Sequence, residues 1–126
     1  MNDAGERVGS LPCYRPPWSR LMAIDASSGE VAWESVLGIS EALPPGKQLV
    51  GSTGSAGPSV TASGLVFVGG TSDRRFRAFD AQTGNQIWEV TLESNVTANP
   101  MTYLGRDDKQ YVAAVAGDKL VAFKLR

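Results

Sequence analysis

The sequence has no histidine, a single cysteine and no long apolar run. Without histidine, the chain lacks the commonest general base and the commonest metal ligand of proteins. No stretch approaches the ~18 apolar residues of a membrane-spanning helix, so we expect no direct membrane insertion. The 12 Lys and Arg side chains are balanced by 13 Asp and Glu. This balance leaves no basic excess for a phosphate backbone, which argues against nucleic-acid binding.

The single cysteine, Cys13, cannot close a disulfide within one copy of the chain. Two interpretations stay open: a small buried apolar residue, or a thiol whose partner lies elsewhere in a larger protein. The amino end does not resemble a signal peptide, because polar residues interrupt any apolar stretch, namely Asn2, Asp3, Glu6 and Arg7. A length of 126 residues and a hydrophobic content of 42% predict one globular domain.

What the chain does contain is a repeated phrase. Residues 23–33 and 78–88 share the pattern Ala-x-Asp-x-x-x-Gly-x-x-x-Trp at a displacement of 55 residues. The shared residues are Ala23 and Ala78, Asp25 and Asp80, Gly29 and Gly84, and Trp33 and Trp88. Such a repeat predicts similar units that bury their apolar faces against one another. Within each unit we expect the Asp and Gly to fix a turn and the Trp to pack in a core.

Short runs rich in Val, Phe, Tyr, Thr and Ile lie between 14 glycines and seven prolines, which predicts many short strands. Residues 1–19 are polar and then Pro-rich, and we interpret them as an irregular lead-in. The expected strands occupy residues 20–25, 30–36, 58–62, 64–69, 75–80, 86–92, 98–103, 110–116 and 119–125.

These strands follow a four-strand plan, so the fold expected for residues 20–126 is all-β, with antiparallel four-stranded blades of a partial β-propeller. The chain would hold about two and a quarter blades. They comprise the third and fourth strands of one unit (20–36), a complete unit (57–93) and the first three strands of a last unit (97–125).

The repeated phrase resembles the tryptophan-docking motif of quinoprotein dehydrogenases, eight-bladed propellers that use pyrroloquinoline quinone (PQQ) and usually Ca²⁺. Further segments are similar to the late blades of the membrane-bound glucose/quinate dehydrogenase branch. They are Leu11-Pro12-Cys13-Tyr14-Arg15-Pro16-Pro17-Trp18 with residues 21–25, residues 57–67, and residues 99–103 with 110–112. The resemblance covers residues 9–126. It implies the C-terminal segment of a periplasmic enzyme that oxidises sugars, polyols or alcohols.

The resemblance also implies where a cofactor would lie. Turns between the third and fourth strands of a blade occupy one face, and the remaining long loops occupy the other face, which holds the quinone in this family. The residues expected to contact the cofactor are Asp73, in a Thr-x-Asp turn, then Thr53, Asn99, Thr71 and Asp118. An alternative role for Asp73 is to stabilise its own tight turn.

Several parts of the family's active site are not in these residues. The proposed catalytic base, the ring-stacking Trp and the Ca²⁺ ligands belong to earlier blades. The usual Gly-Gly-His-Gly loop is Ala116-Gly117-Asp118 here, so the His that is expected to face the cofactor is missing. The adjacent carboxylates Asp107 and Asp108 are expected in a solvated turn rather than in an acid–base site. We therefore expect the chain alone to be inactive.

Two functions remain open at this point. The first is a C-terminal segment of a PQQ-dependent dehydrogenase, completed by the remaining propeller blades. The second is a self-assembling repeat scaffold or binding module without catalysis, completed by further copies of the chain. Both follow from the expectation that an open stack of blades exposes apolar faces and unpaired strand edges, which favour association.

Overall fold

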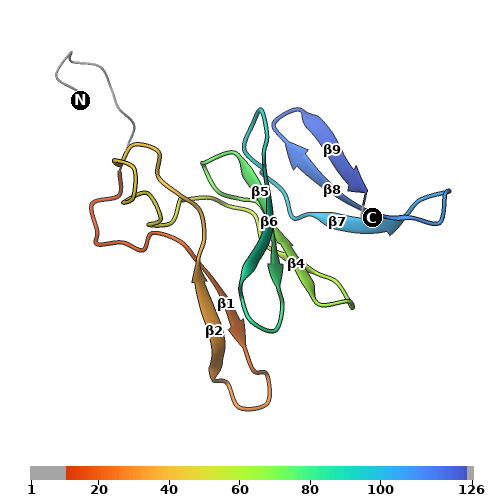
Figure 1. Cartoon of the computed structure of the whole chain (residues 1–126), viewed down its shortest axis with the longest axis horizontal. Coiled ribbons are helices and arrows are strands. Elements are labelled where there is room, and N and C mark those ends of the chain that lie inside the picture. The colour runs from red at the N-terminus through yellow and green to blue at the C-terminus, as the bar shows by residue number, and fades with distance from the viewer. Residues whose placement is uncertain (1–10, 125–126) are drawn as a thin grey trace.

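The computed structural model describes residues 11–124, and they form an all-β fold of antiparallel sheets (Figure 1). The first sheet is a hairpin of β1 (Arg20–Ile24) and β2 (Val31–Val36). The middle sheet contains β3 (Ser59–Val60), β4 (Leu65–Val68), β5 (Arg75–Asp80) and β6 (Gln86–Thr91). The last sheet contains β7 (Met101–Leu104), β8 (Gln110–Ala116) and β9 (Lys119–Lys124). The predicted all-β class is confirmed, and the described strands divide into sheets of two, four and three.

The repeated phrase gives two hairpins with the same local geometry. Ala23 pairs with Trp33 across the first hairpin, and Ala78 pairs with Trp88 across β5 and β6. In both hairpins the register shifts immediately after this pair. Because the irregularity lies at the same place in each repeat, both indoles leave their strands at an equivalent position relative to the turn of their own hairpin.

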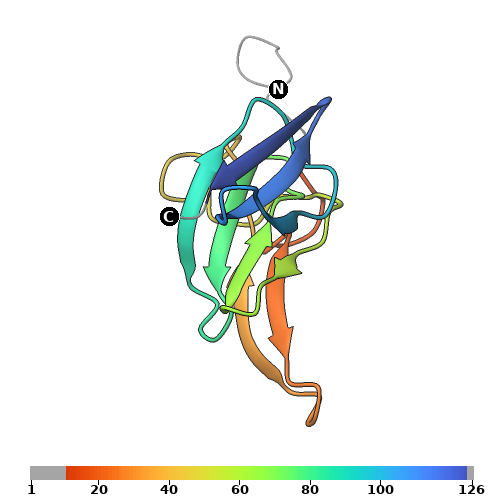
Figure 2. The ribbon, with the colours of Figure 1, turned by 90° about the vertical axis from the view of Figure 1, so that its right-hand side faces the viewer.

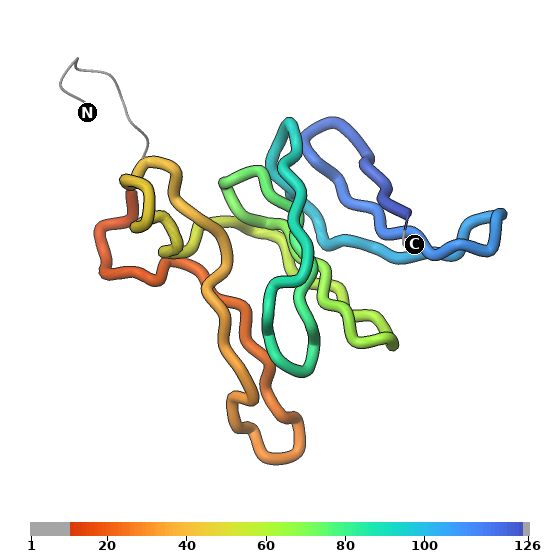
Figure 3. Tube along the Cα trace, viewed as in Figure 1, coloured from red at the N-terminus to blue at the C-terminus, as the bar shows by residue number. Residues whose placement is uncertain are grey.

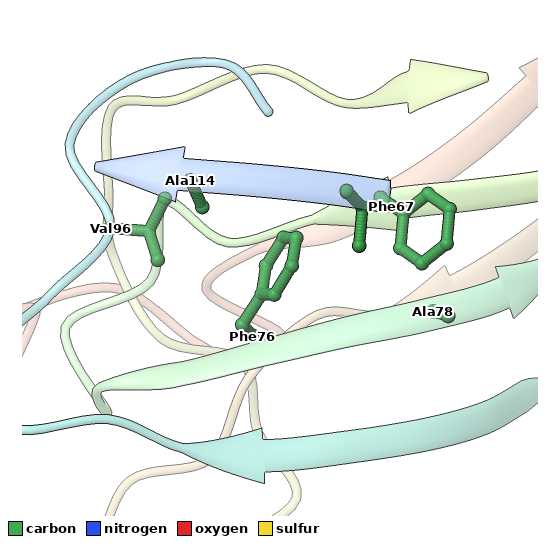
Figure 4. Packing of buried hydrophobic residues seen from close by; sticks show 6 residues of the cluster. Phe67, Phe76, Ala78, Val96 and Ala114 are labelled. Carbon is green, nitrogen blue, oxygen red and sulfur yellow. The ribbon is translucent and has the colours of Figure 1, made fainter. Parts of the chain in front are cut away.

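The middle sheet is buried on both of its faces, because alternate residues of a strand point to opposite sides. Phe67, Phe76 and Ala78 face the last sheet and pack with its Val112 and Ala114. Figure 4 shows this cluster from close by. Val96, in the loop between residues 91 and 101, also belongs to the cluster. The opposite face of the middle sheet contributes a second cluster, formed by Val66, Val68 and Phe79 with Leu21 and Leu37.

Phe76 lies at the centre of the core between the middle and last sheets, and it is fully buried. Its ring centroid lies 6.1 Å from that of Phe67, 5.9 Å from Trp88 and 5.9 Å from Phe123. The Trp88 ring meets it edge to face, at an interplanar angle of 87°. Edge-to-face contacts of this kind add to the stabilisation from apolar burial.

The outer sheets keep one apolar face exposed. Met22 and Ile24 of β1 are exposed on the first sheet, and Met101 and Leu120 are exposed on the last. In the described residues, β9 pairs with β8 alone, so its other edge has no neighbouring strand. The first hairpin also extends away from the rest of the chain, as the two views at right angles show (Figures 1 and 2).

Two expectations need correction. Cys13 is exposed and free, so the interpretation as a small buried apolar residue is wrong. The strand expected at 58–62 is only two residues long, Ser59–Val60. Its far end is replaced by a turn in which Thr61 Oγ1 accepts a hydrogen bond from the Leu65 amide at 3.0 Å. Side chains of this type compete with the strand ladder for backbone groups. Residues 1–10 of the lead-in and residue 125 of the last expected strand lie outside the described residues.

The position of Phe76 predicts a large effect of its truncation. Phe76→Ala should lower the free energy of unfolding by about 3–5 kcal/mol, because it removes the ring shared by three aromatic neighbours and leaves a cavity. Leu120→Ala is the control, since Leu120 is 71% exposed, and it should change stability by less than about 0.5 kcal/mol. Urea unfolding followed by circular dichroism measures both. Equal effects of the two substitutions would contradict the described core.

Candidate functional site

Several connections gather at one end of the stacked sheets, opposite the turns that contain Gly29 and Gly84 (Figure 3). We call this end the loop face; it comprises residues 37–57, 69–74, 92–99 and 117–118. Its segments are tied together by backbone hydrogen bonds. The Ser72 amide donates to the Thr53 carbonyl at 2.8 Å, and the Gly117 amide donates to the Asn95 carbonyl at 3.2 Å. All five residues expected to contact a cofactor lie on the loop face.

Asp73 of the loop face forms a buried ion pair with Arg77 of the adjoining strand β5. Arg77 Nη2 donates to Asp73 Oδ2 at 2.5 Å, and Nη1 donates to Oδ1 at 3.3 Å. The side chains of Arg77 and Asp73 are only 2% and 1% exposed. Thr71 Oγ1 donates to Asp73 Oδ1 at 2.6 Å, and the Ile39 amide donates to Oδ2 at 2.9 Å. Asp73 thus connects the middle sheet with the segment that follows β2.

Arg77 and its neighbour Arg75 extend this pair into a network. Glu89 of β6 accepts from Nε of both arginines at 3.0 Å. Arg75 Nη1 also donates to Glu41 at 3.0 Å, so a second contact reaches the segment after β2. Within the described residues, no buried side-chain nitrogen or oxygen lacks a partner. A buried charge is stable only with such partners, so the network is complete as it stands.

The electrostatics of Asp73 reflect two opposing effects. Burial raises the pKa of its carboxyl, but the hydrogen bonds from Arg77, Thr71 and the Ile39 amide outweigh it. The pKa of Asp73 is therefore lowered, and the ionised form is favoured. Every oxygen of this carboxylate already accepts from protein donors. The structure accordingly gives Asp73 the turn-stabilising role, while direct contact with a cofactor stays a prediction.

The other predicted residues have different surroundings. Thr71 is buried and donates its hydroxyl to Asp73. Thr53, Asn99 and Asp118 are exposed. Asn99 Oδ1 accepts from the Gly57 amide at 2.6 Å, which fixes the start of the middle sheet against the loop before β7. Asp118 lies in the tight turn between β8 and β9. Their cofactor contacts also stay predictions.

Glycine allows two segments of the loop face to cross in direct contact. A Cβ on Gly54 would lie 1.1 Å from the Gly70 carbonyl oxygen. A Cβ on Gly70 would lie 2.6 Å from the Ala56 carbonyl oxygen, and Gly70 has φ of +68°. No other residue fits such a crossing. The long segment 37–57 is therefore held close against the loop between β4 and β5.

Sequence reasoning missed two residues of the candidate site, Arg77 of β5 and Arg74 of the loop face. Arg77 lies in a strand, and an arginine in an alternating pattern gives no sign that it is buried. Arg74 is exposed and has φ of +58°, a left-handed conformation uncommon outside glycine. Its amide donates to Asn95 Oδ1 at 3.1 Å, so the following loop supports this conformation. The sequence contains no signal for either feature.

The opposite end of the stack carries the repeated turns. Trp33 of the first sheet donates its Nε1–H to the Ala81 carbonyl at 2.9 Å. Its ring lies on Gly84, where a Cβ would come within 2.4 Å of Trp33 Cε3. Asp80 Oδ1 stabilises the turn by accepting from the Gln82 and Thr83 amides at 2.9 Å and 2.8 Å. This contact joins the first and middle sheets at one end, and the Asp73 network joins them at the other.

The residues that the structure describes contain no group of three or more His, Cys, Asp or Glu side chains that could hold a metal ion. They also include no helix with the length and apolarity needed to cross a bilayer.

Comparison with known proteins agrees with this architecture. The family described as "PQQ: Glucose/ethanol/alcohol dehydrogenase, beta-propeller domain" matches residues 3–112. The chain belongs to this family. A PQQ dehydrogenase propeller is built from sheets of this kind, so the three stacked sheets are part of a β-propeller.

Individual members of the PQQ propeller family are similar over most of this chain. The glycerol dehydrogenase large subunit of Gluconobacter thailandicus is 39% identical over 89% of the chain, and quinoprotein glucose dehydrogenase A of Acinetobacter calcoaceticus is 37% identical over 91%. A solved europium-containing methanol dehydrogenase is 40% identical over 75% of the chain, with a TM-score of 0.56. The chain spans 16%, 16% and 14% of these three proteins, respectively.

The Asp73–Arg77 pair predicts how stability depends on pH. Asp73→Asn should destabilise the chain by about 3–5 kcal/mol at neutral pH, because it leaves the buried Arg77 charge without its partner. The pKa of Asp73 is lower in the folded chain than in the unfolded chain. The stabilisation is therefore complete above the unfolded pKa of about 3.9 and is lost as the pH falls through the folded pKa.

Urea unfolding of the wild-type chain and Asp73→Asn from neutral to acidic pH measures this dependence. The difference between the two should shrink as the pH falls below about 4. Asp118→Asn is the control, because Asp118 is an exposed carboxylate on the same face. A difference that stays constant down to the lowest pH at which the chain folds would contradict the role of the ion pair.

Proposed function

We propose that this chain is the C-terminal blade segment of a PQQ-dependent dehydrogenase of the membrane-bound glucose/quinate type. The observation that carries the proposal is the match to the PQQ propeller family over residues 3–112, on a chain whose middle sheet is a complete four-stranded blade. Its role there is structural, and its loop face forms one wall of the quinone site. The substrates of the complete enzyme are sugars, polyols or alcohols, since relatives are named for glycerol and glucose.

PQQ supplies a planar quinone that accepts two electrons from an alcohol when it is bound in a dehydrogenase. The described loop face offers groups that suit the rim of such an anionic, polar cofactor. Thr53 and Ser72 are exposed hydroxyls, and Arg74 is an exposed guanidinium. Asp73 supports these groups indirectly, because its carboxylate oxygens already accept hydrogen bonds from Arg77, Thr71 and the Ile39 amide. These groups fit one side of a quinone site, and the rest of the site belongs to other blades.

The metal of the complete enzyme is Ca²⁺ or a lanthanide. Ca²⁺ is the ion expected from the family resemblance, and one similar solved structure is a europium-containing enzyme. The ligands lie in blades beyond this chain. A periplasmic location follows from the same resemblance.

A second candidate function is a self-assembling repeat scaffold without catalysis. The observation that favours it is the exposed apolar face on each outer sheet, such as Ile24 at 60% and Leu120 at 71% exposure. Exposed apolar surfaces of this kind mark sites of association. Light scattering tests this candidate, which predicts a defined oligomer that closes a ring of about eight blades.

A chimera tests the proposed function. This chain replaces the aligned segment of the Acinetobacter glucose dehydrogenase, which is 37% identical to it. We expect the chimera to retain PQQ after desalting, as measured by its absorbance. Thr53→Val, on the loop face, should weaken PQQ retention about tenfold through loss of one hydrogen bond. Thr83→Val, in the turn at the opposite end, is the control and should leave retention unchanged.

A chimera that has native near-ultraviolet circular dichroism but does not retain PQQ would contradict the proposal. The chain by itself, supplied with PQQ, Ca²⁺ or a lanthanide, glucose and an artificial electron acceptor, should give no turnover. Oxidation of glucose by the isolated chain would also overturn the structural role.

A further inference from the structure

Arg77 occupies a position that is apolar in the other two units. The repeat aligns Arg77 with Met22 at the displacement of 55 residues, and the shared Ala-Phe of residues 78–79 and 122–123 aligns Arg77 with Val121. The first and last sheets therefore form with an apolar side chain at this position. Because burying an ion pair costs desolvation energy that an apolar side chain does not, the charge of Arg77 serves something other than the sheet itself.

Arg77 is oriented by a contact that the first repeat lacks. Met22 lies opposite Glu34 in the first hairpin. Arg77 lies opposite Glu89 in the middle sheet, and Glu89 Oε2 accepts from Arg77 Nε at 3.0 Å, whereas methionine offers no such donor. The guanidinium is a rigid plane, so a bond at Nε sets the direction in which the other two nitrogens point. Both of these nitrogens donate to the carboxylate of Asp73.

Through Asp73, Arg77 fixes the path of two loop segments. The oxygens of Asp73 that contact the guanidinium also accept from the Thr71 hydroxyl and from the Ile39 amide. Arg77 Nη1 reaches Thr71 Oγ1 directly as well, at 3.2 Å. One carboxylate therefore holds both the loop between β4 and β5 and the segment after β2. A buried ion pair contributes little net stability, but it can specify one geometry.

The same two segments carry the exposed hydroxyls of the loop face. Ser72 directly precedes Asp73, and its amide donates to the Thr53 carbonyl at 2.8 Å. The hydroxyls of Ser72 and Ser52 lie 2.6 Å apart, which is a second bond between the segments. Ser72 and Thr53 are exposed, whereas Ser52 is buried beneath them. Because hydrogen bonds tolerate only small changes of distance and angle, a displaced Asp73 would displace both exposed hydroxyls.

We propose that Arg77 is a positioning residue of the candidate quinone site. Glu89 orients Arg77, and through Asp73 the guanidinium holds the Thr53 and Ser72 hydroxyls in the geometry that binds the quinone. Arg77 touches no ligand itself, because its side chain is only 2% exposed. Groups that bind a ligand need such support from the residues behind them. The identity of the ligand rests on the proposed function, but the holding of the loops does not.

Glu89→Gln tests the orientation of Arg77 in the full chain. Glutamine keeps the shape of the side chain but has one acceptor oxygen for two arginines, and the side chain of Glu89 is 34% exposed, so no unpaired charge is buried. Amide hydrogen exchange resolved by residue measures the effect. We expect the Ile39 and Ser72 amides to exchange about tenfold faster, while the amides of β4 keep their rates.

Glu34→Gln is the matched control. Glu34 has the equivalent position in the repeat and accepts from Arg20 at 3.1 Å, but it contacts no residue that holds the loop face. Its substitution should leave the exchange of the loop amides unchanged. The double variant Asp73→Asn with Arg77→Met removes both charges, so neither is left buried alone, and should accelerate the same loop amides. If the double variant loses its native near-ultraviolet circular dichroism, Glu89→Gln alone decides.

The chimera with the Acinetobacter glucose dehydrogenase connects the positioning to the quinone. Titration of the chimera with PQQ, followed by its activity, separates the affinity for PQQ from the kcat at saturating PQQ. Glu89→Gln should raise the PQQ concentration for half-maximal activity about tenfold and leave that kcat unchanged. Glu34→Gln should change neither quantity.

The outcomes distinguish this inference from the proposed function. Equal PQQ affinity of the wild-type and Glu89→Gln chimeras would overturn the inference and leave the proposed function intact. A folded wild-type chimera that binds no PQQ would contradict the proposed function instead, and the exchange rates then decide the positioning by themselves. Unchanged exchange of the Ile39 and Ser72 amides, or equal acceleration in β4, would overturn the inference as well.

Discussion

The structure depends on the burial of a sheet from both sides. A propeller blade is a sheet with two apolar faces. Both faces are buried from solvent only when another sheet packs on each side. Only the middle sheet has this arrangement within the described residues, and it supplies more of the buried side chains than either of the other sheets. Val66 and Phe79 face one neighbour, while Phe67 and Phe76 face the other. Each outer sheet is incomplete, and only one of its faces packs against the middle sheet.

The first and middle sheets contact each other at both ends, and the two contacts differ in their chemistry. At one end an indole packs on a glycine turn, and most of the contact is apolar. At the loop face, a carboxylate buried with Arg77 binds the backbone of the segment after β2 through the Ile39 amide. A buried ion pair contributes little net stability compared with apolar packing, but it fixes one geometry. This division is suited to a face whose loops must be held in place for a ligand.

Much of the fold could be predicted from the sequence. The repeated Asp and Gly specify turns through local hydrogen bonds and a positive φ, and the runs between them have strand composition. The site was harder to predict. Asp73 was expected to contact a cofactor, but its partner Arg77 is buried, and burial depends on the neighbouring sheet rather than on local sequence. Trp33 and Trp88 have the same sequence pattern, and only the three-dimensional structure shows that Trp33 lies on the Gly84 turn while Trp88 packs on Phe76 and Phe123.

Amide hydrogen exchange of the intact chain, resolved by peptide, tests the central claim most directly. Exchange reports the stability of each sheet separately. The account predicts that the amides of β4 and β5 exchange slowest, since their sheet is covered on both faces, and that those of the first hairpin and β7 exchange much faster. Equal protection in all three sheets, or slowest exchange in the first hairpin, would contradict it.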